Sequence, residues 1–599
     1  MCGINGTTHP DPEAIKRMSA ETSHRGPDYL GFFTDKDIAI SHNLLSIRGS
    51  GDISKQPYSL DERWVLSFNG QIYNTERLIR EHNLNPDENL RNLDTYILNL
   101  LIQKVGIDFC KYIHGMFAIA LYDRIQKKLW LFRDPSGQKP LYFYNKGRIF
   151  AFSSEIKAIL SLAYVDNTTD DQAIALSCSL GYLPGDRTIF KHIKKLNPSQ
   201  FLCFDLKSQN IALNYFRPET SNYYAEMDEL QALESLVDEH LQSKAEISIN
   251  LSGGLDSSII ASLASKSGRQ IYSYTTFFEN CDPSYNQDAE LARKMAKDFN
   301  FKHNQLNISH QDYRDNFIES YEAVEEPNYN ISLPAYLITA KAEGINGDKL
   351  RVVLSGDGGD EIFGGYTYYQ ELQRQYKMMR LLTYPIYNFL KSLKRKEYMH
   401  FDNPVSRWLF FKKFKTEFLS AEINNEMLSK ELTEIINPET ISKLKNKGPI
   451  NQAMLLDRSL WLNAENFIRS DKIFMTQSME MRCPFAFQPF RDYIDSRFTD
   501  KDYFKKGQNK FKIRGIVNNI LPDYISKRPI KTGWRSPIES WYDNKTKNLF
   551  LEILPTKDSN LIKWSKVKRL VQNSDKWPGK VVHLYLSLAI LSEKFKINL

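Results

Sequence analysis

Apolar and polar residues alternate at 247–251, where three aliphatic side chains stand two positions apart. This period of two predicts a short buried strand. The strand runs directly into the polar stretch 252–258 (SGGLDSS), and the spacing of 259–268 predicts a helix that ends at a glycine. Two glycines allow a close backbone approach, and the free N–H groups of a helix start point at an anion. The pattern therefore predicts a phosphate-binding loop, with an ordinary serine-capped turn as the alternative.

Two further apolar runs, 271–278 and 351–354, predict strands of the same sheet, and 288–303 has helical spacing between them. Strands that alternate with helices are typical of a parallel α/β sheet. The run at 351–354 leads into 355–366, which contains three acids and five glycines. Ligands bind beyond the carboxyl ends of strands in such sheets. This stretch therefore predicts a second loop for phosphate and metal, with a flexible acidic turn as the alternative.

Asp256 is unexpected inside a phosphate-binding loop, because a carboxylate repels phosphate oxygens. A divalent cation between the two groups removes this conflict, and Mg²⁺ prefers oxygen ligands. The loop lacks the lysine of the common G-x-x-x-x-G-K-[ST] nucleotide motif. It therefore predicts a nucleotide site of a different kind.

The chain before residue 215 carries other candidate residues. Residues 64–68 alternate like a strand and lead into Asn69 and Gly70, which could donate hydrogen bonds to a developing oxyanion. On sequence alone the same pair is more typical of a plain turn. Cys2 follows the initiator methionine, whose removal would leave the thiol beside a free α-amine that can act as its base. A cysteine placed there by chance is the alternative.

Composition limits the classes of function. The formal charge of +7 is small for 599 residues and does not by itself indicate a nucleic-acid partner. The six cysteines are scattered without paired spacing, which is typical of reduced thiols and argues against a disulfide framework or a zinc site. No apolar run approaches the ~18 residues of a membrane span, and the first residues lack the pattern of a secretory signal. We therefore expect a cytoplasmic protein of several domains.

Two groups of motifs resemble known families. The stretch 252–258 is similar to the SGGxDS loop of ATP pyrophosphatases, which adenylate a carboxylate or carbonyl group and release pyrophosphate. In the first part of the chain a series of short segments follow one another in order: CGI at 2–4, HRGPD at 24–28, NGQIYN at 69–74, GMFAIALYD at 115–123, RDPSGQKPLY at 133–142 and SSEIKAI at 153–159. Together they resemble the glutaminase domain of class II amidotransferases, the N-terminal-nucleophile (Ntn) hydrolases. The position of this domain ahead of the SGGLDSS loop is similar to the order in glutamine-hydrolysing asparagine synthetases.

The resemblance implies a two-domain α/β fold. An αββα Ntn-hydrolase sandwich would occupy 1–215, and a parallel-sheet α/β domain of the ATP-pyrophosphatase (adenine nucleotide α-hydrolase-like) type would occupy 216–599. Within the second domain, 376–418 is basic and aromatic. We interpret it as a pair of amphipathic helices with lysines outside, the alternative being a surface for an anionic partner or a membrane face.

In the first domain the resemblance implies a site that hydrolyses glutamine. Cys2 would attack the side-chain amide of glutamine and form a thioester. Asn69 and Gly70 would form the oxyanion hole. These three residues are the implied catalytic set of this domain.

Two positions of the implied glutamine pocket depart from the family pattern. Leu44 stands where the family has the arginine that grips the glutamine α-carboxylate, and Gln71 replaces a glutamate. Loss of a charge-assisted contact costs roughly 1.5–3 kcal/mol of binding, and Arg48 is the candidate substitute. Asp94 would hold the α-amino group. The implied glutamine-binding residues are Leu44, Arg48, Asn69, Gly70, Gln71 and Asp94.

In the second domain the resemblance implies a site for ATP-dependent adenylation. Lys510 would neutralise charge on the phosphates, and we expect it on one side of a helix with Arg514; a solvated lysine is the alternative. Asp357 stands where the best-known asparagine synthetases have glutamate, at a position tied to forming the acyl-adenylate. Asp256 and Asp360 would share Mg²⁺. The implied ATP-binding residues are Leu251, Ser252, Gly253, Gly254, Asp256, Ser257, Thr276, Ser355 and Gly356.

Residues 455–485 resemble a helical block of the family that leads into E-x-R-x-P-F-L-D. Here Phe487 takes the place of the final aspartate. We expect this block to support the pocket structurally.

Together these implications predict an ATP-consuming glutamine amidotransferase. Ammonia from glutamine would pass inward, and ATP with Mg²⁺ would adenylate an acceptor carboxylate so that ammonia displaces AMP. Aspartate is the leading acceptor. A uronic acid of a surface polysaccharide and a degenerate, non-catalytic homologue are the alternatives. The expected partners are glutamine, ATP and the acceptor, without nucleic acid, and a homodimer is the candidate assembly.

Overall fold

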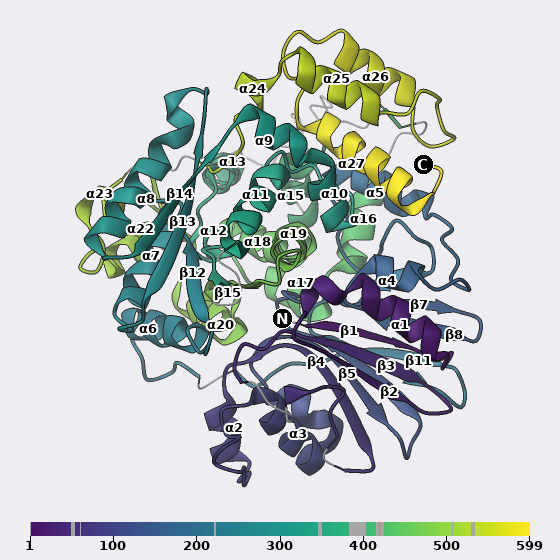
Figure 1. Ribbon diagram of the computed structural model, residues 1–599. Helices are drawn as coiled ribbons and strands as arrows, with labels where there is room; N and C mark the ends of the chain where they lie inside the picture. Colours follow the sequence, from purple (N-terminus) through teal and green to yellow (C-terminus); the bar gives the residue numbers. More distant parts are fainter. Residues whose placement is uncertain are drawn as a thin grey trace.

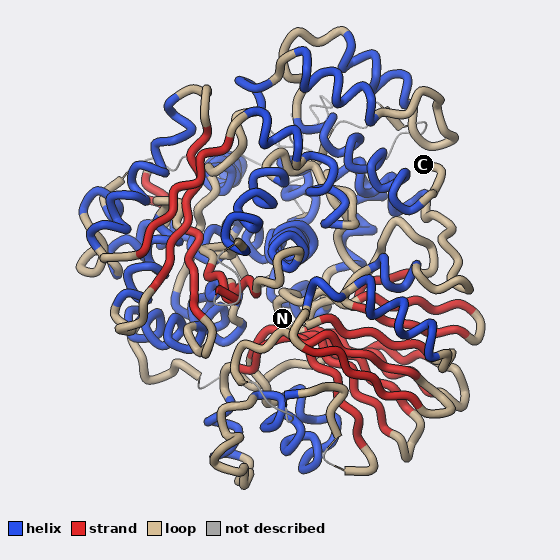
Figure 2. The backbone as a smooth tube through the Cα atoms, in the orientation of Figure 1, coloured by secondary structure: helices blue, strands red, loops and turns tan. Residues whose placement is uncertain are grey.

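The computed structural model describes residues 2–49, 54–59, 61–220, 223–345, 350–381, 403–414, 418–419, 425–505, 507–528 and 533–599. Two regions with different sheets lie side by side, and the N-terminus lies between them (Figure 1). Figure 2 shows the strands gathered into two groups, with helices filling the space between and above them.

The first region consists of two antiparallel sheets packed face to face. The six-stranded sheet has the order β2-β3-β1-β8-β7-β9, and the five-stranded sheet has the order β11-β10-β6-β5-β4. Side chains from both sheets, among them Ile4, Val65, Ala118 and Phe152, meet in one buried cluster. The strands are β1 (Gly3–Thr7), β2 (Tyr29–Thr34), β3 (Ala39–Leu44), β4 (Trp64–Ile72), β5 (Gly115–Asp123), β6 (Lys128–Arg133), β7 (Tyr142–Lys146), β8 (Ile149–Ser153), β9 (Ile193–Lys195), β10 (Gln200–Asp205) and β11 (Ile211–Tyr215).

Helices cover the outer faces of both sheets. Ile15 and Ile156 pack with Ala151 of the first sheet, and Leu98 packs with Phe68 of the second. The layers are therefore α, β, β and α, and the expected sandwich is confirmed. The covering helices are α1 (Pro12–Glu21) and α4 (Ile156–Leu160) on one side and α2 (Thr75–Glu81) and α3 (Asp94–Val105) on the other.

The second region is built on a five-stranded sheet in which every neighbouring pair is parallel. Its order is β14-β13-β12-β15-β16. Ile249 and Val352 pack against helices on one face, and Tyr274 and Val353 pack against helices on the other. The expected parallel α/β architecture is confirmed. The elements are β12 (Glu246–Asn250), β13 (Ile271–Phe278), β14 (Lys302–Ile308), β15 (Leu350–Leu354) and β16 (Glu480–Arg482), with α6 (Glu229–His240), α7 (Leu255–Ser265) and α8 (Gln287–Asp298) on the first face and α11 (Leu333–Gly344) and α19 (Phe467–Met475) on the second.

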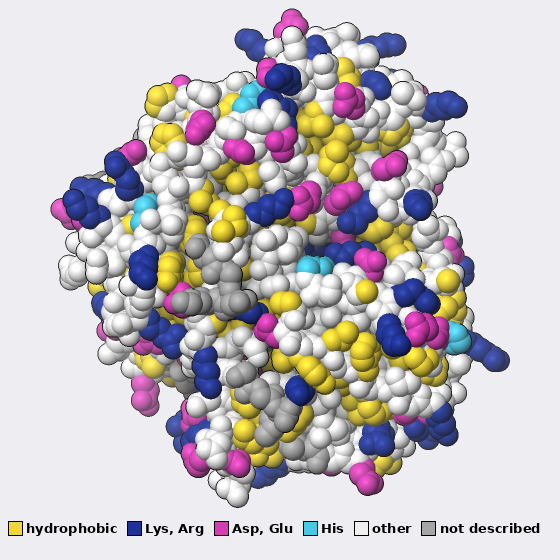
Figure 3. Space-filling view, in the orientation of Figure 1, with side chains coloured by type: hydrophobic (Ala, Val, Ile, Leu, Met, Phe, Trp, Pro, Cys, Tyr) yellow, Lys and Arg dark blue, Asp and Glu magenta, His cyan; other side chains and the backbone are white. Residues whose placement is uncertain are grey.

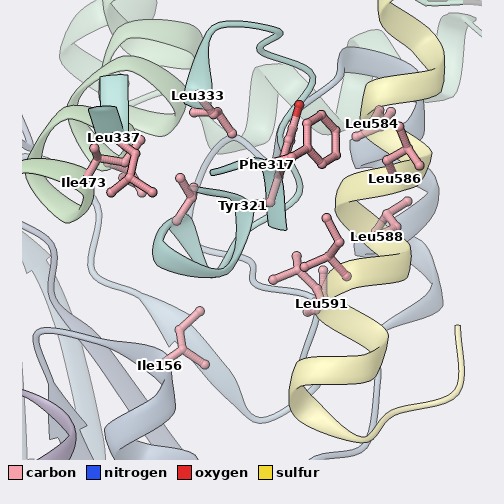
Figure 4. Packing of buried hydrophobic residues seen from close by; sticks show 14 of the residues in the cluster. Ile156, Phe317, Tyr321, Leu333, Leu337, Ile473, Leu584, Leu586, Leu588 and Leu591 are labelled. Carbon is pink, nitrogen blue, oxygen red and sulfur yellow. The ribbon is translucent and has the colours of Figure 1, made fainter. Parts of the chain in front are cut away.

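A continuous core joins the two regions. Figure 4 shows leucines of α27 (Lys580–Phe595) beside Phe317 and Tyr321 of α10 (Phe317–Val324), with Ile156 of the first region in the same cluster. The sequence after residue 541 shows no recognised motif. In the structure this segment contributes buried side chains to the shared core. The other helices of this end are α25 (Asn544–Ile553) and α26 (Trp564–Gln572).

Buried ion pairs also cross between the regions. The Arg25 guanidinium, fully buried, lies 2.9 Å from Glu155 of its own region and 2.7 Å from Asp471 of the second region. Lys195 of the first region lies 2.6 Å from Glu326 of the second, and both side chains are buried. Removal of one partner from such a pair leaves an uncompensated buried charge, so these contacts fix how the two regions sit against each other.

The bounds of several elements differ from the sequence-based expectation. The strand expected at 64–68 continues to Ile72. The helix expected at 288–303 ends at Asp298, because Asn300 adopts a left-handed conformation (φ 55°) and β14 begins at Lys302. The block at 455–485 is not helical throughout, because β16 joins the edge of the parallel sheet.

Within this block the chain forms a π-helix, η7 (Asp457–Asn466), between α18 (Pro449–Leu456) and α19. Turns of this type are rare and frequently mark functional sites. Asn466 at its end lines the cavity at the ends of β12 and β15 that is described below.

The basic and aromatic segment 376–418 is described only in part. Helix α13 (Thr367–Leu381) enters it and α15 (Pro404–Lys412) lies within it, whereas 382–402 falls outside the described residues. The expectation that its lysines face outward is wrong for Lys412, which lies 2.9 Å from Asp457. Its ammonium group lies 4.5–5.9 Å from the ring centres of Tyr366, Tyr368, Trp408 and Trp461.

Figure 3 shows Lys and Arg side chains interspersed with Asp and Glu on the face in view. The formal charge of +7 is not gathered into one basic patch among the coloured residues of that face.

Candidate active sites

A small cavity of about 50 Å³ surrounds Cys2 at the start of β1. Cys2 is 6% exposed, and its backbone N–H donates to Asn69 Oδ1 at 2.9 Å. Arg25 Nε donates to the Cys2 carbonyl at 3.1 Å. Burial raises the pKa of the Cys2 thiol, while the nearby N-terminal charge lowers it. The thiol is therefore held in place and depends on a base for activation.

Asn69 and Gly70 lie inside β4 and not in a turn. Asn69 Nδ2 is buried and has no hydrogen-bond partner within the described part of the chain. Gly70 has φ 153°, and a Cβ there would overlap the carbonyl oxygen of Met116. A free amide donor beside Cys2 suits a developing oxyanion.

Leu44 and Arg48 both line the cavity, so a guanidinium group is present although Leu44 is not an arginine. Arg48 donates to the carbonyl of Ile72 at 3.3 Å. With its amide oxygen turned toward Arg48, Gln71 accepts from Arg48 Nε at 2.7 Å. Burial lowers the pKa of Arg48, and Asp94 opposes that shift.

Asp94 begins α3 and lines the same cavity. Its carboxylate accepts from the backbone N–H groups of Ile72 at 3.1 Å and Thr95 at 3.0 Å. Burial raises the pKa of Asp94, and Arg48 lowers it. Arg48 and Asp94 thus place a cationic and an acidic side chain in the same cavity, as a zwitterionic ligand requires.

Glu480 is an unexpected member of this cavity, because it comes from the edge strand of the second region. Arg482 Nε donates to Glu480 at 2.6 Å. Burial raises the pKa of Glu480, but Arg482 and the N-terminal charge outweigh it and hold that pKa at about 2. The neighbouring Met481 lines the second cavity, so adjacent residues of β16 reach both sites. The block therefore adds lining residues to both cavities, beyond the structural support expected of it.

The second cavity, of about 220 Å³, opens where β12 and β15 end. Every residue of the implied ATP-binding set lines it. Gly253 has φ 73°, and a Cβ there would overlap the carbonyl of Asp288, so this position requires glycine. The lining residues from the two loops are Leu251, Ser252, Gly253, Gly254, Leu255, Asp256, Ser257, Ser355, Gly356, Asp357, Gly358, Asp360 and Glu361.

Lys510 joins the two loops. Its ammonium group contacts Asp256 and lies 2.6 Å from Asp360 Oδ1. We expected Lys510 and Arg514 to share a helix. Instead, Lys510 precedes α22 (Phe511–Ile516) in a left-handed conformation (φ 55°), and only Arg514 lies within that helix. Both residues nevertheless line the cavity. A Cβ at Gly365 would overlap Asp360, so this contact depends on glycine.

The two carboxylates fit a magnesium ion. Asp256 Oδ1 is buried and lacks a hydrogen-bond partner within the described ranges. Mg²⁺ is usually held by one or two carboxylates together with substrate phosphates, so Asp256 and Asp360 suffice without a third protein ligand. The described residues contain no group of three or more His, Cys, Asp or Glu arranged for a metal.

Asp357 lies at the side of the cavity formed by the π-helix and α19. It accepts from Asn466 Nδ2 and from Ser470 Oγ, each at 3.3 Å. Tyr336 and Tyr366 also line this side. The sequence carries no local signal for Asn466 as a site residue. Like Ser470, the other partner of Asp357, it lies within a long helical block and belongs to no recognised motif.

Thr276 of β13 also lines the cavity. Trp534 Nε1 donates to Thr276 Oγ1 at 2.6 Å, and the Trp534 ring lies edge-on to Tyr336 at 4.5 Å. An aromatic wall of this kind suits a planar base.

Comparison with protein families agrees with this geometry. A family model described as asparagine synthase matches residues 230–593, and one described as glutamine amidotransferase domain matches residues 1–216. The chain belongs to the asparagine synthase family. It is an enzyme of this family, of the ligase and amidotransferase type. The division at residue 215 stays a prediction.

Similar proteins extend over most of the chain. Asparagine synthetase [glutamine-hydrolyzing] 1 of Bacillus subtilis is 26% identical over 91% of this chain and 88% of its own length. Asparagine synthetase [glutamine-hydrolyzing] 3 of the same organism is 27% identical over 88% of this chain and 86% of its own length. Asparagine synthetase B [glutamine-hydrolyzing] of Escherichia coli is 27% identical over 62% of this chain and 66% of its own length. In the described part of this chain, no helix has both the length and the apolar character to cross a bilayer.

Proposed function

We propose that this enzyme transfers ammonia from glutamine to the side-chain carboxylate of aspartate, with ATP cleaved to AMP and pyrophosphate. The observation that carries the proposal is the meeting of Asp256, Asp360 and Lys510 at the ends of β12 and β15, in one cavity with Asp357. Two acids and one ammonium group at a glycine-rich strand end suit a metal-bound triphosphate.

Glutamine would be hydrolysed in the first cavity. The Cys2 thiol passes its proton to the α-amine that removal of Met1 would free, its sulfur adds to the side-chain amide carbon, and the protonated α-amine then gives a proton to the departing nitrogen. Asn69 Nδ2 and the Gly70 N–H stabilise the oxyanion, ammonia leaves, and water hydrolyses the thioester to glutamate. Arg48 would hold the α-carboxylate, and Asp94 the α-amino group.

ATP would react in the second cavity. An acceptor carboxylate oxygen bonds to the α-phosphorus, and pyrophosphate leaves. Asp256 and Asp360 would hold Mg²⁺, which when bound supplies positive charge to the phosphate oxygens. Lys510 adds a further positive charge beside the leaving group.

Ammonia would then displace AMP from the acyl carbon. Asp357, held by Asn466 and Ser470, is placed to accept a proton from the attacking ammonia. Glu480 lines the first cavity and the adjacent Met481 lines the second, which supports transfer of ammonia between them without loss to water.

Pyrophosphate release with ATP and Mg²⁺ tests the proposal. We expect release with aspartate and glutamine, accompanied by glutamate. Release with a nucleotide-linked uronate but not with aspartate would replace the acceptor and leave the chemistry intact. Absence of both glutamate and pyrophosphate with every acceptor would favour a non-catalytic homologue.

A further inference from the structure

A third cavity lies at the junction of the two regions, apart from both sites above. Its volume is about 120 Å³. Loops of the first region contribute Ser136 and Asn197, and the second region contributes the π-helix and α20 (Gln488–Arg497). None of the residues proposed above for glutamine hydrolysis or adenylation lines it.

The acidic side chains of this cavity already have cationic partners. Asp495 pairs with Arg458 at 2.9 Å. Asp492 lies 3.4 Å from Lys443, and Glu439 lies 3.0 Å from the same lysine. These pairs account for every acid and for two of the three cations that line the cavity.

The remaining cation is Arg491. Its side chain has no hydrogen bond or ion pair within the described ranges, and its Nε is buried without a partner. Burial and the neighbouring Arg458 lower the pKa of Arg491 to about 10, although Asp492, Asp495 and Asp134 act in the opposite direction. A guanidinium group with unsatisfied donors in a cavity is a binding element for a carboxylate.

Gln488 supplies the complementary group. It precedes Arg491 by three residues and therefore lies on the same side of α20. Its Nε2 donates to Asp492 at 3.3 Å, whereas its Oε1 is buried and has no partner among the described residues. An acceptor without a donor requires a ligand that also carries an N–H or O–H group.

We propose that this cavity binds a small zwitterion of the α-amino-acid class, with its carboxylate on Arg491 and its ammonium group toward Gln488 Oε1 and Asp492. The nearby acids Asp492 and Asp495 disfavour a dianion, and the cavity volume suits a molecule much smaller than a nucleotide. The site is a binding site separate from the reaction.

The π-helix connects this cavity to the proposed acceptor site. Arg458, Ser459 and Asn463 of the π-helix form part of its wall. The same helix ends at Asn466, which bonds to Asp357. A bound amino acid would therefore rest on the element that holds Asp357.

Isothermal titration of the full chain, without ATP or glutamine, tests the site. Glycine and L-serine are the probes, and acetate, methylammonium and orthophosphate are separate arms. We expect one glycine or serine per chain, with acetate, methylammonium and orthophosphate each at least about tenfold weaker. No binding of glycine or serine, or equal binding of acetate or orthophosphate, would overturn the proposal.

Variants on one helix locate the binding. Arg491→Gln and Gln488→Leu should each weaken glycine and serine binding about tenfold or more. Arg497→Gln is the matched control, since Arg497 lies on α20 but bonds to the carbonyl of Met227 outside the cavity. Thermal melting establishes whether each variant is folded. If Arg491→Gln does not fold, the Gln488→Leu variant alone tests the proposal. Unchanged affinity in a folded Arg491→Gln or Gln488→Leu variant would place the ligand elsewhere and contradict the proposal.

Discussion

The two proposed active sites are built on opposite principles although they share one core. The glutamine cavity, about 50 Å³, is lined by β4, the start of α3 and the segment after β3, and its two oxyanion donors, Asn69 Nδ2 and the Gly70 N–H, come from adjacent residues of one strand. The ATP cavity, about 220 Å³, is enclosed by loops beyond parallel strands, where glycines let a large ligand approach. The comparison teaches that each chemistry depends on residues that the other does not use, so each can be removed separately.

Cys2→Ala should separate the two activities most clearly, because it removes glutamine hydrolysis and leaves the ATP site intact. We expect complete loss of glutamine-driven amide synthesis, because the thiol that would attack the amide carbon is removed, and unchanged synthesis with ammonium salts. The measurement is pyrophosphate release with each nitrogen source, and ammonium-driven turnover is the internal control. Survival of glutamine-driven turnover would remove Cys2 from its assigned role.

Lys510→Met should disable the other site. We expect a fall of about 10³-fold in pyrophosphate release with either nitrogen source, since one positive charge beside the leaving group is lost. Glutamate production from glutamine without ATP should be unchanged. Lys512→Met, which alters a partly exposed lysine on the next helix, is the matched control. Normal pyrophosphate release by the Lys510 variant would exclude the assigned role.

Asn69→Ala should weaken only the glutamine site. Loss of the Nδ2 donor is expected to lower glutaminase kcat about 10²-fold with a small change in KM, because an oxyanion donor acts mainly in the transition state. Ammonium-driven synthesis should not change. A rise in KM at constant kcat would instead assign Asn69 to ground-state binding.

The contrast also explains which parts could be predicted from the sequence. The loop at 252–258 follows from local pattern, since a period of two, two glycines and helical spacing occur within one stretch. Asn69-Gly70 resembles a turn locally and becomes a strand because β5 pairs along it, which is a long-range contact. Glu480 and Asn466 reach their cavities from far along the chain. The left-handed conformation of Lys510 was not predictable, because non-glycine residues rarely adopt it.

Arg48→Gln tests how the glutamine site compensates for Leu44. We expect the KM for glutamine to rise about 10- to 100-fold, which corresponds to loss of one charge-assisted contact, with kcat little changed. Adding Leu44→Arg to this variant should restore part of the affinity, because Leu44 lines the same cavity. An unchanged KM in the single variant would show that the α-carboxylate is held elsewhere.

The smallest expected effect concerns stability, and here the two regions should respond to pH with opposite sign. His42, buried between the sheets of the first region, has a pKa lowered by burial to about 3 from 6.5, so its contribution to stability is lost as pH falls from 6.5 toward 3. Glu343, buried beneath β12, has a pKa raised by burial to about 8 from 4.5, so its contribution is present below 4.5 and lost as pH rises toward 8. The measurement is the free energy of unfolding in urea as a function of pH. Glu343→Gln should reduce its fall on the alkaline side, and His42→Gln should reduce its fall on the acidic side, each by a few kcal/mol at most. If Glu343→Gln left the profile between pH 5 and 8 unchanged, that carboxyl would not be held neutral in the folded chain.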